Sequence, residues 1–186
     1  QKDSEPAPIR SGGTLKLVTP CNQNNMYESY VLKEYLAYRM FNLVTPYSFK
    51  TRLVKIKYID SGRPRYSLEM YGFLIENDKD MAARNQSALI EKRALNQSMM
   101  NTADMARVAV YNYMIGNTDW WLPSQHNVKV VTSLKELSVK AIPVAYDFDY
   151  SGLVSTEYAV PLKNIPVKAV TERYYMGMCY SEDELE

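Results

Sequence analysis

Acidic and amide side chains gather in residues 116–152, and they are the side chains of this chain best suited to chemistry. Asp119 stands near the start of the stretch, Asn127 follows it, and Asp147 and Asp149 stand near the end. Carboxylate and carboxamide oxygens suit a hard cation such as Mg²⁺, which takes one or two protein carboxylates and completes its shell with water and substrate phosphates. These residue types therefore predict a metal site that works on phosphates.

A hairpin is expected to bring these residues together. Apolar or alternating residues predict strands at Asn127–Thr132 and Val139–Tyr146, joined by the polar spacer Ser133–Ser138. Because a hairpin returns the chain to its starting point, we expect Asp119, Asn127 and Asp147 to meet at one edge of a sheet, with the Asp119 and Asp147 carboxylates within about 10 Å, close enough for a shared metal with a water-mediated shell.

Each acidic stretch also has a purely structural interpretation. Asn117-Thr118-Asp119 can be an Asx-type turn, and residues 147–152 can be a polar loop. His126 is the sole histidine; it either orients Asp119 or is structural, and the structural role is favoured. With no second histidine and no cysteine nearby, a zinc site is not expected. The residues alone leave these alternatives open.

A strand over Thr14–Thr19 and a helix over Met26–Leu43 are expected before this stretch. The helix has tyrosine and apolar side chains at helical spacing and an asparagine in front that can cap it. Glu34 falls on or beside the apolar stripe, where a carboxylate is costly without a partner. Lys16 on the strand is the expected partner; the alternative is two solvated surface charges.

Two longer strands should follow, at Ser48–Asp60 and Arg65–Glu76, with a turn between them. The second strand ends in Gly72-Phe73-Leu74-Ile75-Glu76, which is either a central buried strand or a segment that receives a ligand at its end. Short helices or turns are then predicted at Asp78–Asn85 and Ser87–Asn96.

The second long helix is predicted over Thr102–Ile115, capped by Thr102 and ended by Gly116. It would hold the first acidic stretch at its C-terminal end. After the second acidic stretch the chain is expected to be irregular through Pro166, with short helices at Val167–Met176 and after Ser181.

These stretches resemble a known group. GNTD, HN and YDFD are similar to the catalytic and metal loops of atypical kinase-like proteins, namely the spore-coat kinase CotH, the HipA-type kinases and, more remotely, the secretory-pathway kinases. Whole phrases resemble exported bacterial proteins of the CotH-like group: LKLVTPC, LKEYLAYR, TPYSF, YGFLIE, YMIGNTDW, HNVK and PYDFDYSG, over about residues 15–177.

The resemblance implies an α+β, protein-kinase-like core: a three-stranded antiparallel sheet with one helix in residues 14–76, then a mainly helical half with the hairpin in residues 77–186, after a disordered arm at 1–13. It implies ATP and Mg²⁺ as cofactors and phosphoryl or nucleotidyl transfer to an unknown acceptor, which can be a protein. The residues take these roles: Asp119 as catalytic base, Asn127, Asp147 and Asp149 as metal ligands, Lys16 as phosphate clamp, Glu34 as its orienter, and Glu76 as the hinge that receives adenine.

Three departures from the pattern favour an alternative, a catalytically inactive interaction or structural module of the same fold at the cell exterior. No phosphate-covering loop precedes Lys16, and further helices are expected after residue 186, so the chain is either a fragment or a reduced core. The Asp119–Asn127 spacing is longer than in the kinase signature, so Trp121–Ser124 would have to bulge out. Asp149 stands where the kinase signature has glycine.

Composition limits the remaining possibilities. The 186 residues are 46% hydrophobic and carry 22 basic against 21 acidic residues, which indicates a globular protein and argues against nucleic acid as a partner. No apolar run is long enough for a transmembrane segment. The chain opens at Gln1, so we expect a leader to have been removed and an extracytoplasmic location. Cys21 and Cys179 are then a disulfide; in a cytosolic protein they would be two buried thiols.

Overall fold

The computed structural model of the protein describes residues 14–63, 65–91, 94–135 and 140–185. The expected arm at 1–13 and part of the spacer Ser133–Ser138 lie outside them. The described chain is α+β, with small antiparallel sheets and few helices. Its elements in order are β1 (Lys16–Val18), α1 (Asn25–Val44), β2 (Thr51–Ile59), β3 (Ser67–Ile75), α2 (Asp78–Arg84), β4 (Ser87–Leu89), the 3₁₀ turn η1 (Gln97–Met99), α3 (Thr102–Ile115), the 3₁₀ turn η2 (Leu122–Ser124), β5 (Val128–Ser133), β6 (Ile142–Ala145) and α4 (Glu182–Leu185).

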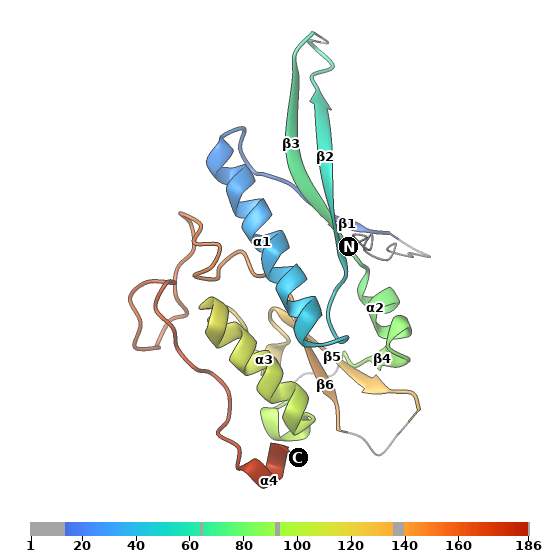
Figure 1. The fold of residues 1–186 in the computed structure, drawn as a ribbon, viewed down its shortest axis with the longest axis vertical. Coiled ribbons are helices and arrows are strands. Elements are labelled where there is room, and N and C mark those ends of the chain that lie inside the picture. Colours follow the sequence, from blue (N-terminus) through green and yellow to red (C-terminus); the bar gives the residue numbers. More distant parts are fainter. Residues whose placement is uncertain (1–13, 64, 92–93, 136–139, 186) are drawn as a thin grey trace, which may run out of the picture.

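The first sheet has the order β1-β3-β2 and is antiparallel throughout, as expected. β2 and β3 form a long hairpin that reaches the far end of the molecule's long axis, whereas β1 pairs only with the last residues of β3 (Figure 1). α1 packs against β3. Tyr35 and Tyr38 of the helix lie against the ring of Phe73, which is fully buried.

The second sheet, β4-β5-β6, corrects two expectations. Ser87–Asn96 is not a helix: its first three residues form β4, which pairs with the outer edge of β5 through Ser87 and Ser133. An unpaired edge leaves backbone groups without partners, and this short strand satisfies them. The half that follows β3 is therefore mixed in structure and not mainly helical.

The C-terminal segment contains no helix over Val167–Met176, although one was expected. Its backbone bonds elsewhere: the Gln97 side chain bridges the carbonyl of Met176 and the N–H of Met178. The segment passes around the outside of α3 and ends in α4, which packs on α3 (Figure 1). Contacts to other elements thus hold the end of this irregular segment.

Both long helices cover nearly the residues expected from the sequence. Asn24 caps α1 by accepting from the N–H of Met26. α3 covers the expected residues, but Asn101 and not Thr102 is its cap, because the Asn101 side chain accepts from the N–H of Asp104. Gly116 ends α3 in the left-handed conformation, with φ of +69°.

An aromatic cluster joins the two parts of the chain. Phe148, from the loop after β6, is fully buried and contacts the rings of Tyr38 and Phe41 on α1 and of Tyr111 on α3. The Tyr111 hydroxyl also donates to the backbone carbonyl of Ala37, which ties α3 to α1. The loop that carries Asp147 and Asp149 is therefore anchored by its own central residue.

Candidate functional site

Asp119 is held by its neighbours at the end of α3. Asn117 accepts from the N–H of Asp119 at 3.0 Å, which is the Asx-type turn that the sequence allowed. The Asn127 amide donates to both the backbone oxygen and Oδ2 of Asp119, at 2.8 and 3.0 Å. His126 Nε2 lies 3.0 Å from the other carboxylate oxygen, Oδ1. His126 therefore contacts Asp119, a bond that both an orienting and a structural histidine can make, so its role stays a prediction.

The residues between Asp119 and Asn127 form a loop that is closed by backbone hydrogen bonds. Trp121 and His126 exchange both backbone hydrogen bonds, at 2.9 and 3.0 Å, around the short turn η2. Leu122 is buried beneath this loop. The bulge that the long spacing required is thus present, and it returns Asn127 to Asp119 despite the extra residues.

Asp147 is brought to the same place by the hairpin. The N–H of Tyr146 donates to the backbone oxygen of Asn127 at 3.1 Å, and the N–H of Asp147 donates to the Tyr38 hydroxyl at 2.8 Å. Asn127 and Asp147 both adopt positive φ, 52° and 62°. Asn and Asp tolerate this conformation better than most residues, and such geometry gathers at functional sites.

The two acidic stretches are also bonded to each other. The N–H of Gly152 donates to the carbonyl of Gly116 at 3.1 Å, and the N–H of Leu153 donates to the carbonyl of Ile115 at 2.9 Å. The last carbonyls of α3, which have no partner within the helix, thus hold the loop that contains Asp149. The convergence predicted from the hairpin is reinforced by a contact that the sequence did not indicate.

Glu34, Asp147 and Asp149 line one cleft of about 160 Å³. Residues 18–21 and Tyr158 form part of its wall. Asp149 accepts a hydrogen bond from the Tyr158 hydroxyl at 3.1 Å. The bonds that the Tyr38 and Tyr158 hydroxyls make were not predicted from the sequence; the large number of tyrosines, 16, was the available signal.

Negative charge in the cleft is poorly compensated. Glu34 is 5% exposed, and its burial, followed by the charges of Asp147 and Asp149, raises its pKa to about 8. Partial desolvation, then Asp149 and Asp119, raise the pKa of Asp147 to about 6, against the opposing charges of His126 and Lys16. Burial also raises the pKa of Asp149. Carboxylates arranged this way favour protonation or a cation.

The expected pair of Lys16 and Glu34 is not formed. Lys16 is exposed on β1, and the ion pairs of the described residues do not include one between these two side chains. Glu34 instead accepts from the backbone N–H of Phe148, while Lys16 acts on Asp147. β1 joins the sheet by only three residues, and this short pairing leaves Lys16 at the surface.

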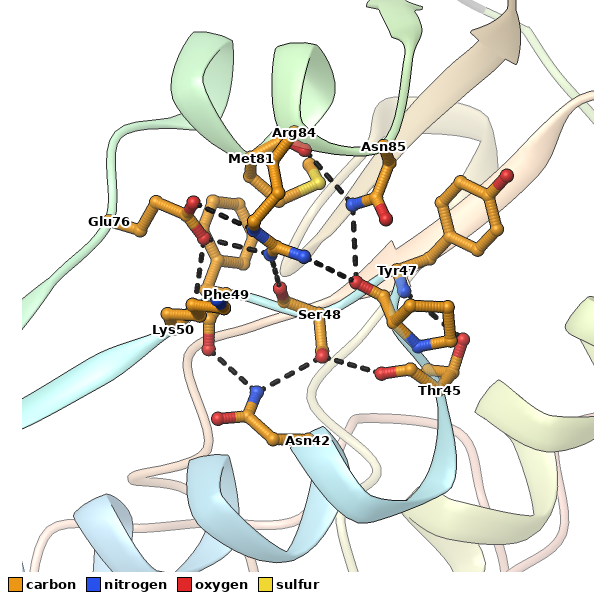
Figure 2. A network of polar contacts seen from close by, with 11 residues as sticks. Asn42, Thr45, Tyr47, Ser48, Phe49, Lys50, Glu76, Met81, Arg84 and Asn85 are labelled. Atoms are coloured by element: carbon orange, nitrogen blue, oxygen red, sulfur yellow. Dashed lines mark hydrogen bonds and ion pairs between the residues drawn. The ribbon is translucent and has the colours of Figure 1, made fainter. Parts of the chain in front are cut away.

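Glu76 is occupied by structural contacts. Its carboxylate accepts two hydrogen bonds from Arg84 and one from the N–H of Lys50, and its own N–H donates to the Lys50 carbonyl (Figure 2). Its carboxylate and its N–H therefore have structural partners. The hinge role of Glu76, in which the backbone receives adenine, stays a prediction.

Cys21 and Cys179 are both exposed free thiols, so neither the disulfide nor the burial expected for them is present. In the described part of the chain, no three side chains of His, Cys, Asp or Glu are grouped closely enough to hold a metal unaided. No helix of the described residues has both the length and the apolar character that crossing a bilayer requires. Comparison of the chain with protein-family models, curated proteins and solved structures finds no match.

Proposed function

We propose that the cleft is the centre of a kinase-like phosphotransferase that uses ATP and Mg²⁺ on an acceptor, by phosphoryl or nucleotidyl transfer. The observation that carries this is the convergence of three separate stretches: the Asn127 amide holds Asp119, and the Asn127 carbonyl holds the residue before Asp147. The order of base, amide and second carboxylate across a hairpin is that of a phosphoryl-transfer site.

The donor set fits a divalent cation. Asn127, Asp147 and Asp149 offer oxygen ligands. Burial first, and then neighbouring carboxylates, raise the pKa of both aspartates, and a bound cation would oppose both effects. Mg²⁺ needs only one or two protein carboxylates when it also binds phosphates. When bound, it would neutralise the charge that develops on the transferred group.

The chain's own residues supply the other roles. Asp119, fixed in the Asx turn and bonded to Asn127 and His126, is the base that accepts the proton of the acceptor hydroxyl. Lys16, exposed on β1 and close enough to lower the pKa of Asp147, is the contact for nucleotide phosphates.

A non-catalytic module at the cell exterior is the second candidate, and one observation favours it. No cation of the described residues pairs with Glu34, so the clamp that positions nucleotide phosphates in kinases is not assembled among them. The two free thiols give an exterior location no added support.

The test is a thermal shift with ATP and MgCl₂, followed by a transfer assay with labelled ATP. At ligand concentrations about 100-fold above Kd, the native state should gain roughly 2.7 kcal/mol. Asp147→Asn should lose the Mg²⁺-dependent part of the shift, and Asp119→Asn should keep the shift but lose transfer. Asp104→Asn, the same chemical change in the first turn of α3, is the matched control.

The outcomes separate the candidates. Each variant's shift is measured against its own ligand-free melting temperature, because removing a crowded carboxylate stabilises the protein by itself. A shift without transfer identifies the non-catalytic module. No shift for the parent protein, or the same shift in Asp147→Asn as in Asp104→Asn, rejects the proposed site.

A further inference from the structure

A second hollow, of about 350 Å³, lies between the end of α1, the start of β2 and the end of α2. Three cationic residues line it, Arg39, Lys50 and Arg84, together with Asn42, Leu43, Pro46, Ser48 and Thr51. It shares no lining residue with the acidic cleft. Arg39 lies five positions after Glu34, or roughly 140° around α1, so the helix presents opposite charges to the two hollows.

A polar network makes one wall of this hollow rigid (Figure 2). Arg84 reaches from α2 to the backbone oxygens of Pro46 and Ser48, at 3.1 and 2.7 Å. Asn42 reaches from α1 to the Ser48 hydroxyl and the Phe49 carbonyl, at 3.0 and 2.8 Å. The loop between α1 and β2 is thus bonded from both sides, and the hollow is preformed.

Two of the three cations lack a counterion. Glu76, which is buried, neutralises Arg84 at 2.9 Å. Arg39 and Lys50 belong to no ion pair within the part of the chain that the structure describes. The Tyr35 hydroxyl accepts from Arg39 at 3.3 Å, which restrains the guanidinium while leaving its other N–H groups available.

A buried hydroxyl at the hollow also lacks a partner. Thr51, at the start of β2, is 4% exposed, and its Oγ1 has no hydrogen-bond partner among the described residues. An unsatisfied buried hydroxyl destabilises the fold unless a ligand completes it. Thr51 lines the hollow beside Lys50, so an anion there would accept the hydrogen bond that the hydroxyl lacks.

We propose that this hollow binds a small organic phosphate monoester. The two uncompensated charges of Arg39 and Lys50 match the charge of a phosphate dianion, and guanidinium and ammonium groups are the usual donors to it. Leu43, which is 89% exposed, and Pro46 form an apolar rim for the carbon part of the ligand. The volume falls near the lower end of small-molecule sites, about 300–1,000 Å³.

Calorimetric titration of the whole chain with phenyl phosphate, at constant ionic strength and without Mg²⁺, tests the proposal. Phenyl phosphate should bind more tightly than inorganic phosphate because of the apolar rim. Arg39→Gln and Lys50→Gln should each weaken binding roughly tenfold, equivalent to about 1.4 kcal/mol. Arg52→Gln and Lys57→Gln, exposed cations of β2 outside the hollow, are the matched controls and should leave binding unchanged.

Thr51→Val is a variant whose loss of binding cannot be attributed to unfolding. It removes the hydroxyl and keeps the shape of the side chain, so the free energy of unfolding should stay equal or rise while phenyl phosphate binds several-fold more weakly. Absence of binding to the parent protein overturns the proposal. So does an equal loss in the β2 control variants, which marks diffuse attraction to surface charge, or unchanged binding in the Arg39→Gln Lys50→Gln double variant.

Discussion

Glu34 is a buried carboxylate. It lies on the buried face of α1, with a single backbone N–H as hydrogen-bond donor and two carboxylates nearby. The sequence indicated that this carboxylate needed a partner, and Lys16 was the predicted one. Whether a lysine reaches a given glutamate depends on where a short strand pairs, and β1 pairs so that Lys16 is exposed.

The pH dependence of stability tests this environment. The pKa of Glu34 rises from an ordinary 4.5 to about 8, so the folded protein binds this proton more tightly than the unfolded chain. The resulting stabilisation is complete below about pH 4.5 and is lost as pH rises through about 8. Glu34→Gln, measured by urea unfolding from pH 5 to pH 9, should remove that loss, on the order of 3 kcal/mol.

Glu172→Gln, an exposed glutamate in the C-terminal segment, is the control and should follow the parent curve. If Glu34→Gln and the parent lose stability in parallel between pH 5 and pH 9, Glu34 is not protonated in the fold and its surroundings are more polar than described.

At the scale of elements, the end of α3 and the loop after β6 act as one unit. Gly116 and Gly152 meet through a backbone hydrogen bond, and the carbonyl of Val170 lies against both. This packing needs the absence of a side chain. A Cβ added at Gly152 would stand 2.4 Å from the Val170 oxygen and 3.0 Å from Thr171 Cα, and backbone atoms cannot move aside cheaply.

Gly152→Ala should therefore lower the free energy of unfolding by roughly 1–3 kcal/mol, as overpacking does elsewhere, and it should weaken any ligand binding in the acidic cleft. Gly62→Ala is the matched change, because its Cβ would meet only the Asp60 carboxylate at 3.4 Å. Chemical denaturation of both variants decides the point. Equal stability of the two would mean that the loop has room beside Val170.

For the whole molecule, no covalent link joins the ends of the fold. Cys21 follows β1 and Cys179 lies near α4, and both are exposed thiols. The C-terminal segment is held by contacts such as the bond from Arg173 to the Met114 carbonyl, at the end of α3. Stability must therefore come from the shared core around Phe148.

Thiol titration checks this arrangement. In protein purified without reductant, two thiols per chain should react with a thiol reagent in native buffer, since both side chains are exposed. Addition of reductant should leave the melting temperature unchanged. A titre near zero, together with a lower melting temperature after reduction, would restore the disulfide and the stabilisation of roughly 5 kcal/mol that closing so long a loop would bring.

Local signals in the sequence determined the long helices and the hairpins. An asparagine cap, a terminal glycine and alternating strands act through bonds within a few residues, so α1, α3 and the β2–β3 hairpin were predictable nearly to their ends, although Asn101 and not Thr102 caps α3. The meeting of Asp119, Asn127 and Asp147 was predictable for the same reason, because a hairpin fixes where its two ends lie.

Contacts distant in sequence decided the rest. β4 is a strand because β5 offers it an open edge. Residues 167–176 are irregular and are held by tertiary contacts, among them the bonds of the Met176 carbonyl to Gln97 and of the Arg173 side chain to the Met114 carbonyl. The Gly116–Gly152 bond, the basic hollow and the separation of Lys16 from Glu34 likewise depend on how whole elements pack. A residue's type determines what it can bind, but only packing determines which groups come within reach of it.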